Sequence, residues 1–167
     1  MGQELTKSDV KRIQDEIDHR KLVLRPQITR EIAEAAAQGD RSENFEYYAA
    51  KKANRENNGR INYLERVLRF AKIIDDSSKE DEVGLNNTAT LYFEEDDEEE
   101  VYRIVTSIRG HSLLGLISNE SPIGRAVMGH KVGDRCEVTT ENGASYYVVI
   151  RKIENTGESE DDYIKAF

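Results

Sequence analysis

The most unusual group of chemically active side chains lies between residues 39 and 44, where two carboxylates stand three positions apart. The segment reads Gly39-Asp40-Arg41-Ser42-Glu43-Asn44. Carboxylate oxygens suit Mg²⁺, which proteins commonly hold with one or two carboxylates together with water and substrate phosphate. Two exposed carboxylates are too few to hold this ion tightly. Asp40 and Glu43 could therefore act only within a metal site that another molecule completes.

The same residues also fit a purely structural role. Asp40 or Ser42 could cap a following helix, and Glu43 would then lie in its first turn, near the positive end of the helix dipole. The spacing alone leaves both interpretations open.

Other kinds of catalytic site are missing from the sequence. It contains no Gly-rich phosphate loop, metalloprotease helix or nucleophile elbow. His19, His111 and His130 show no metal-ligand spacing, and a single cysteine cannot build a Cys-rich zinc site. Cys136 alternates with apolar neighbours, which is typical of a small core residue in a strand.

Two long helices are expected on either side of Gly39. Gly39 is a natural helix stop, so a short connection would join two antiparallel helices of about 30 residues, or ~45 Å each. Pro26 lacks a backbone donor and should kink the first helix without ending it. Tyr47 and Tyr48 are expected to pack within the hairpin. Apolar or small residues recur at the three- and four-residue steps of one helix face, at Val10, Ile13, Ile17, Leu24, Ile28, Ile32 and Ala35, and again at Phe45, Ala49, Ala53, Ile61, Leu64, Leu68 and Ala71.

The second half of the chain predicts a small antiparallel sheet with one short helix. Strands are expected at 88–93 and 101–105, around a hairpin loop made by the acidic run 94–100, with a third strand at 113–117. Ser121 and Pro122 are typical of a helix start, here for a helix over 123–128. A second hairpin, 134–140 and 144–153, would turn at Asn142-Gly143. The fold class is therefore α+β, with a boundary near residues 75–84.

Composition and charge exclude several classes of protein. The 167 residues include 24 Lys+Arg and 33 Asp+Glu, a net charge of −9, and 37% are hydrophobic. Residues 1–75 carry 15 basic and 13 acidic side chains, so the acidic excess lies in the second half. No apolar run reaches the roughly 18 residues of a membrane helix, and the first residues lack the apolar core of a signal peptide. We therefore expect a cytoplasmic protein with no membrane partner.

Several ordered motifs resemble the bacterial Gre transcript cleavage factors, GreA and GreB. The segment 39–47 is similar to the tip motif of that family, and the match extends over about residues 5 to 154. The other matching motifs are Arg25-Pro26 with Ile32-Ala33-Glu34-Ala35, Gly59-Arg60-Ile61 with Leu64-Glu65, Tyr102-Arg103-Ile104-Val105, Ser121-Pro122-Ile123-Gly124-Arg125-Ala126 and Lys131-Val132-Gly133-Asp134.

The resemblance implies a function exerted inside another enzyme. Gre factors bind bacterial RNA polymerase and insert a coiled-coil stalk through its secondary channel. The polymerase then cleaves the 3′ end of backtracked nascent RNA and resumes transcription. By resemblance, Asp40 and Glu43 would help hold the second catalytic Mg²⁺ of the polymerase, with Ser42 and Asn44 as supporting contacts. The chain would have no cofactor of its own, would not be an enzyme by itself, and would act as a monomer.

The resemblance also implies that three segments of the chain have separate roles. Residues 1–76 would form the stalk, 77–154 an FKBP-like domain that binds the polymerase, and 155–167 an acidic tail of unassigned role. Ser121, Pro122 and Ile123 match the docking loop of that domain. A basic patch that contacts the RNA would be made by Arg41, Lys51, Lys52 and Arg55, although an ordinary solvated helix face fits the last three equally well.

Three other functions fit parts of the sequence. A channel-occupying inhibitor would bind the polymerase without promoting cleavage, but both tip carboxylates are present here. A prolyl isomerase or chaperone would need an aromatic-lined apolar cleft in the FKBP-like domain. A generic coiled-coil adaptor would leave the tip sequence unexplained. The sequence does not decide between the short cleavage products typical of GreA and the longer ones of GreB.

Overall fold

The computed structural model describes residues 2–38, 44–75, 79–110, 115–155 and 163–165. The chain forms two compact units. One contains Ser8–Lys72, and the other contains Ile73–Ala166 together with Glu4–Lys7. No helix among the described residues is long and apolar enough to span a membrane.

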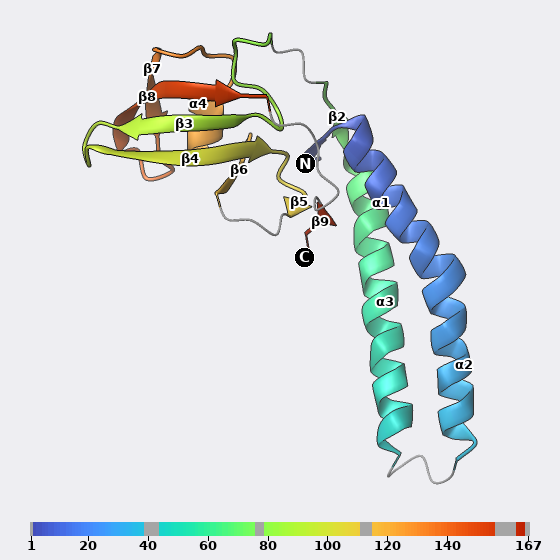
Figure 1. Ribbon diagram of the computed structural model, residues 1–167. Helices are drawn as coiled ribbons and strands as arrows, with labels where there is room; N and C mark the ends of the chain where they lie inside the picture. The colour runs from blue at the N-terminus through green and yellow to red at the C-terminus, as the bar shows by residue number, and fades with distance from the viewer. Residues whose placement is uncertain (1, 39–43, 76–78, 111–114, 156–162, 166–167) are drawn as a thin grey trace. The chain divides into compact units, whose positions relative to one another are not determined.

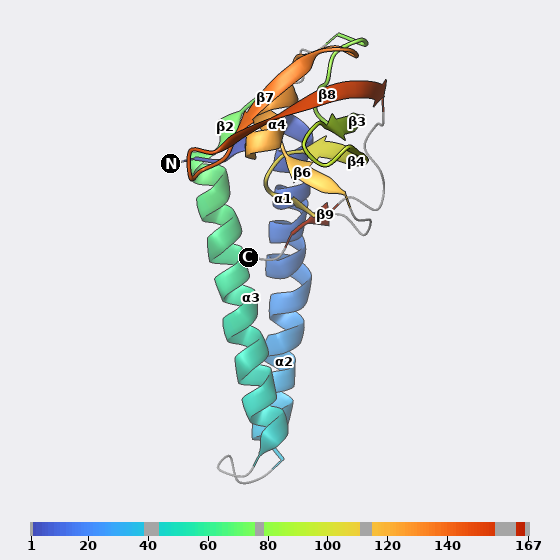
Figure 2. The ribbon, with the colours of Figure 1, turned by 90° about the vertical axis from the view of Figure 1, so that its left-hand side faces the viewer.

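The first unit is a hairpin of two helical arms (Figures 1 and 2). The first arm consists of α1 (Lys7–His19), the π-helical turn η1 (Arg20–Leu24) and α2 (Arg25–Ala36). The second arm is the single helix α3 (Phe45–Phe70), about 39 Å long at 1.5 Å per residue. The predicted apolar stripe is confirmed where it is buried, at Ile13, Ile17, Ile28, Ala35, Ile61 and Leu64.

Pro26 does not end the first arm, as predicted, because the helical arm continues through η1 into α2. A proline lacks the backbone N–H, and its ring crowds the carbonyl four residues earlier. The chain accommodates it with η1, in which the N–H of Arg25 donates to the carbonyl of Arg20, five residues back. Pro26 then occupies the first turn of α2, where a missing donor costs little.

The second unit is built on a five-stranded sheet in the order β6-β4-β3-β8-β7. Its strands are β3 (Thr88–Phe93), β4 (Glu98–Val105), β6 (Leu116–Ser118), β7 (Arg135–Thr139) and β8 (Ser145–Glu154). The helix α4 (Pro122–Val127) lies against one face (Figure 2). The core between them includes Val127, Ile104, Leu91, Ile150 and Cys136, so the buried position predicted for the cysteine is confirmed. Burial raises the pKa of the Cys136 thiol.

The α+β class is confirmed, with two differences in the sheet. The sheet is mixed, because β6 runs parallel to β4, with Arg103 paired to Leu116. The acidic run is also not one long loop. Glu98 to Glu100 belong to β4 and pair with Leu91 to Phe93 of β3, so only residues 94–97 form the turn. The strand pairing supplied by β3 overrides the low strand preference of glutamate.

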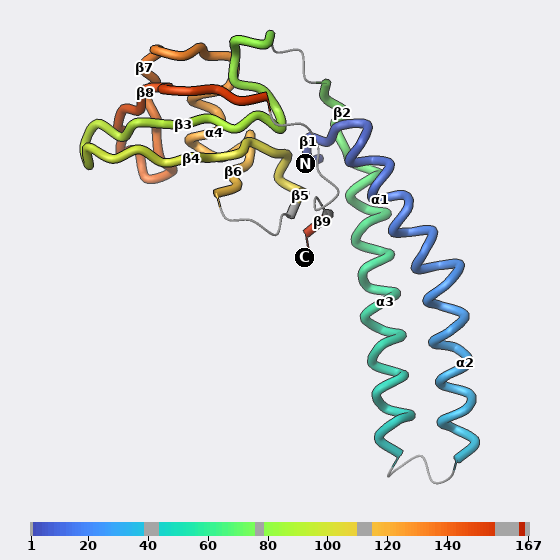
Figure 3. The backbone as a smooth tube through the Cα atoms, in the orientation of Figure 1, coloured from blue at the N-terminus to red at the C-terminus, as the bar shows by residue number. Residues whose placement is uncertain are grey.

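Short strands complete the structure (Figure 3). β1 (Glu4–Leu5) pairs with β2 (Lys72–Ile73). β5 (Arg109–Gly110) pairs with β9 (Tyr163–Ile164), which lies within the segment expected to be a tail. Ile164 is buried, and the N–H of Lys165 donates to the carbonyl of Ile108 at 2.9 Å. Part of the tail is therefore structural. A two-residue strand has no periodicity that a sequence could reveal.

Candidate functional site

The end of α2 and the start of α3 flank the predicted tip segment, residues 39–43, in the sequence. Helix α2 ends at Ala36, and the N–H of Ala37 donates to the carbonyl of Ala33 at 3.2 Å. Helix α3 begins at Phe45. Four of the residues expected to act at the tip, Asp40, Arg41, Ser42 and Glu43, lie outside the described residues, so their roles stay predictions.

Asn44, the fifth tip residue, joins the two arms. Its side-chain oxygen accepts a hydrogen bond from the N–H of Tyr47 at 3.0 Å, which caps α3. Its side-chain NH₂ donates to the carbonyl of Ala35, near the end of α2. Because one partner is a donor and the other an acceptor, only a correctly oriented amide satisfies both. Asn44 therefore ties the end of α2 to the start of α3.

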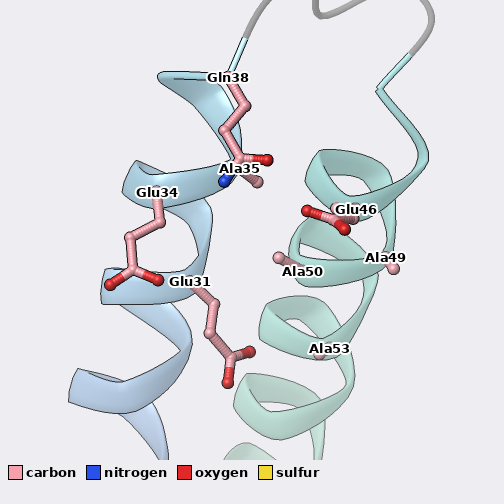
Figure 4. A pocket seen from close by; sticks show the side chains of 8 residues that line it. All are labelled: Glu31, Glu34, Ala35, Gln38, Glu46, Ala49, Ala50 and Ala53. Atoms are coloured by element: carbon pink, nitrogen blue, oxygen red, sulfur yellow. The ribbon is translucent and has the colours of Figure 1, made fainter.

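A shallow groove lies between α2 and α3 just behind this junction (Figure 4). Its volume is about 360 Å³. The carboxylates of Glu31 and Glu46 extend into the gap from opposite helices. Small side chains on α3 leave room for them, and the complete lining is Glu31, Glu34, Ala35, Gln38, Glu46, Ala49, Ala50 and Ala53. Among the described residues, no group of three or more His, Cys, Asp or Glu is placed to hold a metal ion.

Three of the four residues of the predicted basic patch lie on α3, and the fourth, Arg41, lies outside the described residues. Lys51, Lys52 and Arg55 are all exposed, whereas Ala50 is buried and Glu46 extends toward α2. With 100° between successive helix positions, Lys52 lies about 200° from Ala50 and so on the opposite side of the helix. Lys52 has a loose ion pair with Glu56 at 3.8 Å. Glu46 thus lies on the groove side of α3, and Lys52 lies on the opposite side.

A polar network holds the arms together farther along the stalk. Glu16 accepts hydrogen bonds from Nε of Arg20 and Nε of Arg60, each at 2.8 Å. Arg20 also donates to the side-chain oxygen of Asn57 at 3.0 Å, and Asn57 donates back to the Arg20 carbonyl at 3.2 Å. Arg60 is only 7% exposed. Burial alone would raise the pKa of Glu16, but the hydrogen bonds from Arg60 and Arg20 outweigh it and hold this pKa below its ordinary value.

The loop expected to contact the polymerase opens α4. Ser121 caps this helix as predicted, since its hydroxyl oxygen accepts from the N–H of Gly124 at 3.1 Å and its O–H donates to the carbonyl of Ser118 at 2.6 Å. Pro122 occupies the first turn, and Ile123 packs against the core. A groove of about 480 Å³, lined in part by Pro122 and Arg125, lies alongside.

The aromatic side chains of the sheet are used in two ways. Phe93 stacks on Tyr146 with ring centroids 6.1 Å apart and meets Tyr102 edge-on, and all three pack against the core. The ring of Tyr92 instead lies beneath the guanidinium group of Arg151, with 4.4 Å between Cζ and the ring centroid. The ring of Tyr147 lies beneath that of Arg135, with 3.6 Å between the same points.

Sequence reasoning missed three features of the stalk. The Glu16–Arg60 pair joins residues 44 positions apart, which no local pattern reveals. The link from Asn44 to Ala35 likewise crosses the hairpin. Tyr48 was expected inside the hairpin, but it is 53% exposed, and its ring meets that of Tyr47 edge-on at a centroid distance of 5.7 Å.

Comparison with known proteins gives matches over both units. Residues 3–73 match the family model "Transcription elongation factor, N-terminal", and residues 78–155 match "Transcription elongation factor, GreA/GreB, C-term". The chain is 41% identical to transcription elongation factor GreA of Streptococcus pneumoniae over 153 residues, which cover 91% of this chain and 95% of that protein. It is 42% identical, with the same coverage, to GreA of Streptococcus gordonii.

Solved structures of related proteins were also found. One is the crystal structure of GreA factor homolog 1 of Thermus thermophilus, which is 25% identical, with a TM-score of 0.44 and coverage of 92% of this chain and 99% of that one. Another is a GreA/GreB elongation factor from Nitrosomonas europaea, at 18% identity and a TM-score of 0.38, with coverage of 92% and 98%.

Proposed function

Because the chain belongs to the GreA/GreB family of transcription elongation factors, we propose that it binds bacterial RNA polymerase and stimulates the polymerase to cleave backtracked nascent RNA. The observation that supports this proposal is that Asn44, the residue that follows the predicted acidic segment in the sequence, joins the ends of the two helical arms. A narrow arm of two helices can enter a channel that a globular domain cannot.

The donor chemistry of the tip fits Mg²⁺. Asp40 and Glu43 would supply hard carboxylate oxygens, and a magnesium ion held between them and the polymerase would stabilise charge on the reacting oxygens of the RNA phosphate. In this proposal, the chain's own residues place and orient these carboxylates, while the polymerase supplies the remaining ligands. The chain is then a factor that acts in trans.

Other parts of the molecule would bind the polymerase and the RNA while the tip carboxylates act. Ser121, Pro122 and Ile123 would contact the polymerase, with the groove beside α4 as part of that surface. Arg41, Lys51, Lys52 and Arg55 would approach the phosphates of the RNA 3′ segment. The factor would act as a monomer in the cytoplasm, where transcription takes place in bacteria.

A cleavage assay on halted, backtracked polymerase complexes tests the proposal. The wild-type chain should shorten the RNA from its 3′ end, and sizing of the products would distinguish GreA-like from GreB-like cleavage. The double variant Asp40→Asn, Glu43→Gln should still compete with wild type for the polymerase while losing cleavage. Binding without cleavage by the wild type would instead indicate the inhibitor. Nuclease activity of the isolated chain with RNA and Mg²⁺ would contradict action in trans.

A further inference from the structure

The outer side of α3 next to the tip combines exposed aromatic rings with basic side chains. Phe45, Tyr48, Lys52 and Arg55 follow one another at steps of three, four and three residues, which places them on one side of the helix. Phe45 is 87% exposed and Tyr48 is 53% exposed. A single exposed apolar side chain is common, whereas neighbouring ones rimmed by polar residues mark interaction sites.

The backbone of Phe45 and the ring of Tyr48 are both held by neighbouring residues. Phe45 is the first residue of α3, directly after the cap formed by Asn44, so its backbone is fixed by the hydrogen bond from Tyr47 to Asn44. The ring of Tyr48 meets that of Tyr47 edge-on, with an interplanar angle of 67°. A flat surface that is already ordered loses little entropy when a ligand stacks on it.

The charge distribution selects the ligand. Lys52 and Arg55 continue this face away from the tip, and Lys51 lies beside it. Among the residues that the structure describes, Lys51 and Arg55 have no ion-pair partner. The acidic side chains Glu31 and Glu46 lie on the groove side of the hairpin. Glu56 also lies on the outer face, where it pairs loosely with Lys52 at 3.8 Å, so Lys51, Lys52, Arg55 and Glu56 together carry a net charge of +2. A polyanion would therefore meet attraction on the outer face and repulsion on the groove side. Aromatic rings interleaved with basic groups are the arrangement that binds single-stranded nucleic acid, through stacked bases and paired phosphates.

We propose that Phe45 and Tyr48 form a stacking platform for unpaired bases of the RNA 3′ segment, with its phosphates along Lys52 and Arg55. This inference rests on the proposed function, because it takes the RNA to be the segment released from the polymerase active site. It goes beyond a basic patch, since charge alone binds the phosphates whereas the rings bind the bases. Removing a base while keeping its phosphate should therefore weaken binding at this face.

The test compares backtracked complexes whose released RNA segment is either normal or abasic. On normal RNA, Phe45→Ala should raise the concentration of factor needed for half-maximal cleavage about tenfold, the effect expected of one stacked base. Phe45→Trp should preserve the wild-type value. On abasic RNA, the wild type should itself weaken, and the difference between it and Phe45→Ala should disappear.

The matched control is Leu22→Ala in η1, which removes another exposed apolar side chain, 75% open, from the same stalk. This variant should behave as wild type on both RNAs. If wild type and Phe45→Ala cleave normal RNA equally, the platform is refuted while the proposed function stands. If the wild type does not cleave at all, both fail. A concentration-dependent increase in molecular mass that Phe45→Ala abolishes would show that this face binds a second copy, and would overturn the proposal.

Discussion

Replacing Asn44 should separate the stability of the stalk from the placement of its tip. The side chain makes two hydrogen bonds, one that caps α3 and one that reaches across to Ala35. Losing a helix N-cap costs about 1 kcal/mol, and losing an ordinary hydrogen bond costs about 0.5–1.5 kcal/mol. Asn44→Ala should therefore lower the free energy of unfolding by about 2 kcal/mol, or lower Tm by about 5 °C in a chain of this size.

Asn44→Asp is the informative partner variant. Its carboxylate can still accept from the N–H of Tyr47, and a negative charge at a helix N-terminus is favourable by about 0.3–1 kcal/mol. It cannot donate to the carbonyl of Ala35, and that carbonyl would instead repel it. We expect the loss in free energy of unfolding to be less than half as large for Asn44→Asp as for Asn44→Ala. With Asn44→Asp, cleavage of backtracked RNA should nevertheless be several-fold slower than with wild type.

The two assays are thermal unfolding followed by circular dichroism and cleavage at saturating factor concentration. Saturation removes any difference in affinity for the polymerase, so the remaining difference reports on placement of the tip. If Asn44→Asp cleaves at the wild-type rate, the cross-hairpin bond does not position the loop. In that case Asn44 is a helix cap and nothing more.

The remaining predictions concern the stalk network and the α4 loop. Glu16→Gln should destabilise the protein by about 1–3 kcal/mol near neutral pH, because two arginines lose their carboxylate partner. Since the folded pKa of Glu16 is lowered from 4.5, its contribution is present above that value and is lost as the pH falls through the lower folded pKa. The difference between wild type and variant in urea unfolding should therefore shrink on acidification, and a constant difference would contradict this reasoning. Gly124→Ala should destabilise by about 1–3 kcal/mol and weaken polymerase pull-down, because an added Cβ would lie 2.1 Å from the carbonyl oxygen of Ser118. Gly59→Ala is the matched control, since its Cβ would meet nothing within 4 Å, and helix preference should make it neutral or slightly stabilising.

The features that the sequence could predict are those with local causes. The apolar stripe through Ile13, Ile17 and Ile28 has a helical period that is visible without a partner. The cap at Ser121 and the turn at Asn142-Gly143 depend on neighbouring residues alone. In that turn the N–H of Ala144 donates to the side chain of Asn142 at 3.1 Å, and Gly143 takes a positive φ of 87°.

The features that escaped prediction depend on distant partners. Three glutamates in a row indicate a loop until β3 is present to pair with them. The parallel pairing of β6 with β4 is a contact between two separate strands, which composition does not encode. At the candidate site, the acid pair and the basic patch were visible as residue types. The exposure of Tyr48 and the bridging role of Asn44 depend on where α2 lies relative to α3.

The Glu16 network also has a mechanical consequence. Alanine and isoleucine contacts look alike from one turn to the next, so an apolar seam alone would let one arm slip along the other by a turn, about 5.4 Å. Such slippage would separate Arg60 of α3 from the carboxylate of Glu16, and Asn57 of α3 from Arg20, and unpaired buried charge is costly. The helix then fixes the distance from Arg60 to the start of α3 at about 22 Å. In the proposed function, a stalk with a single permitted alignment of its arms would bring the tip carboxylates to the same depth in the polymerase each time it binds.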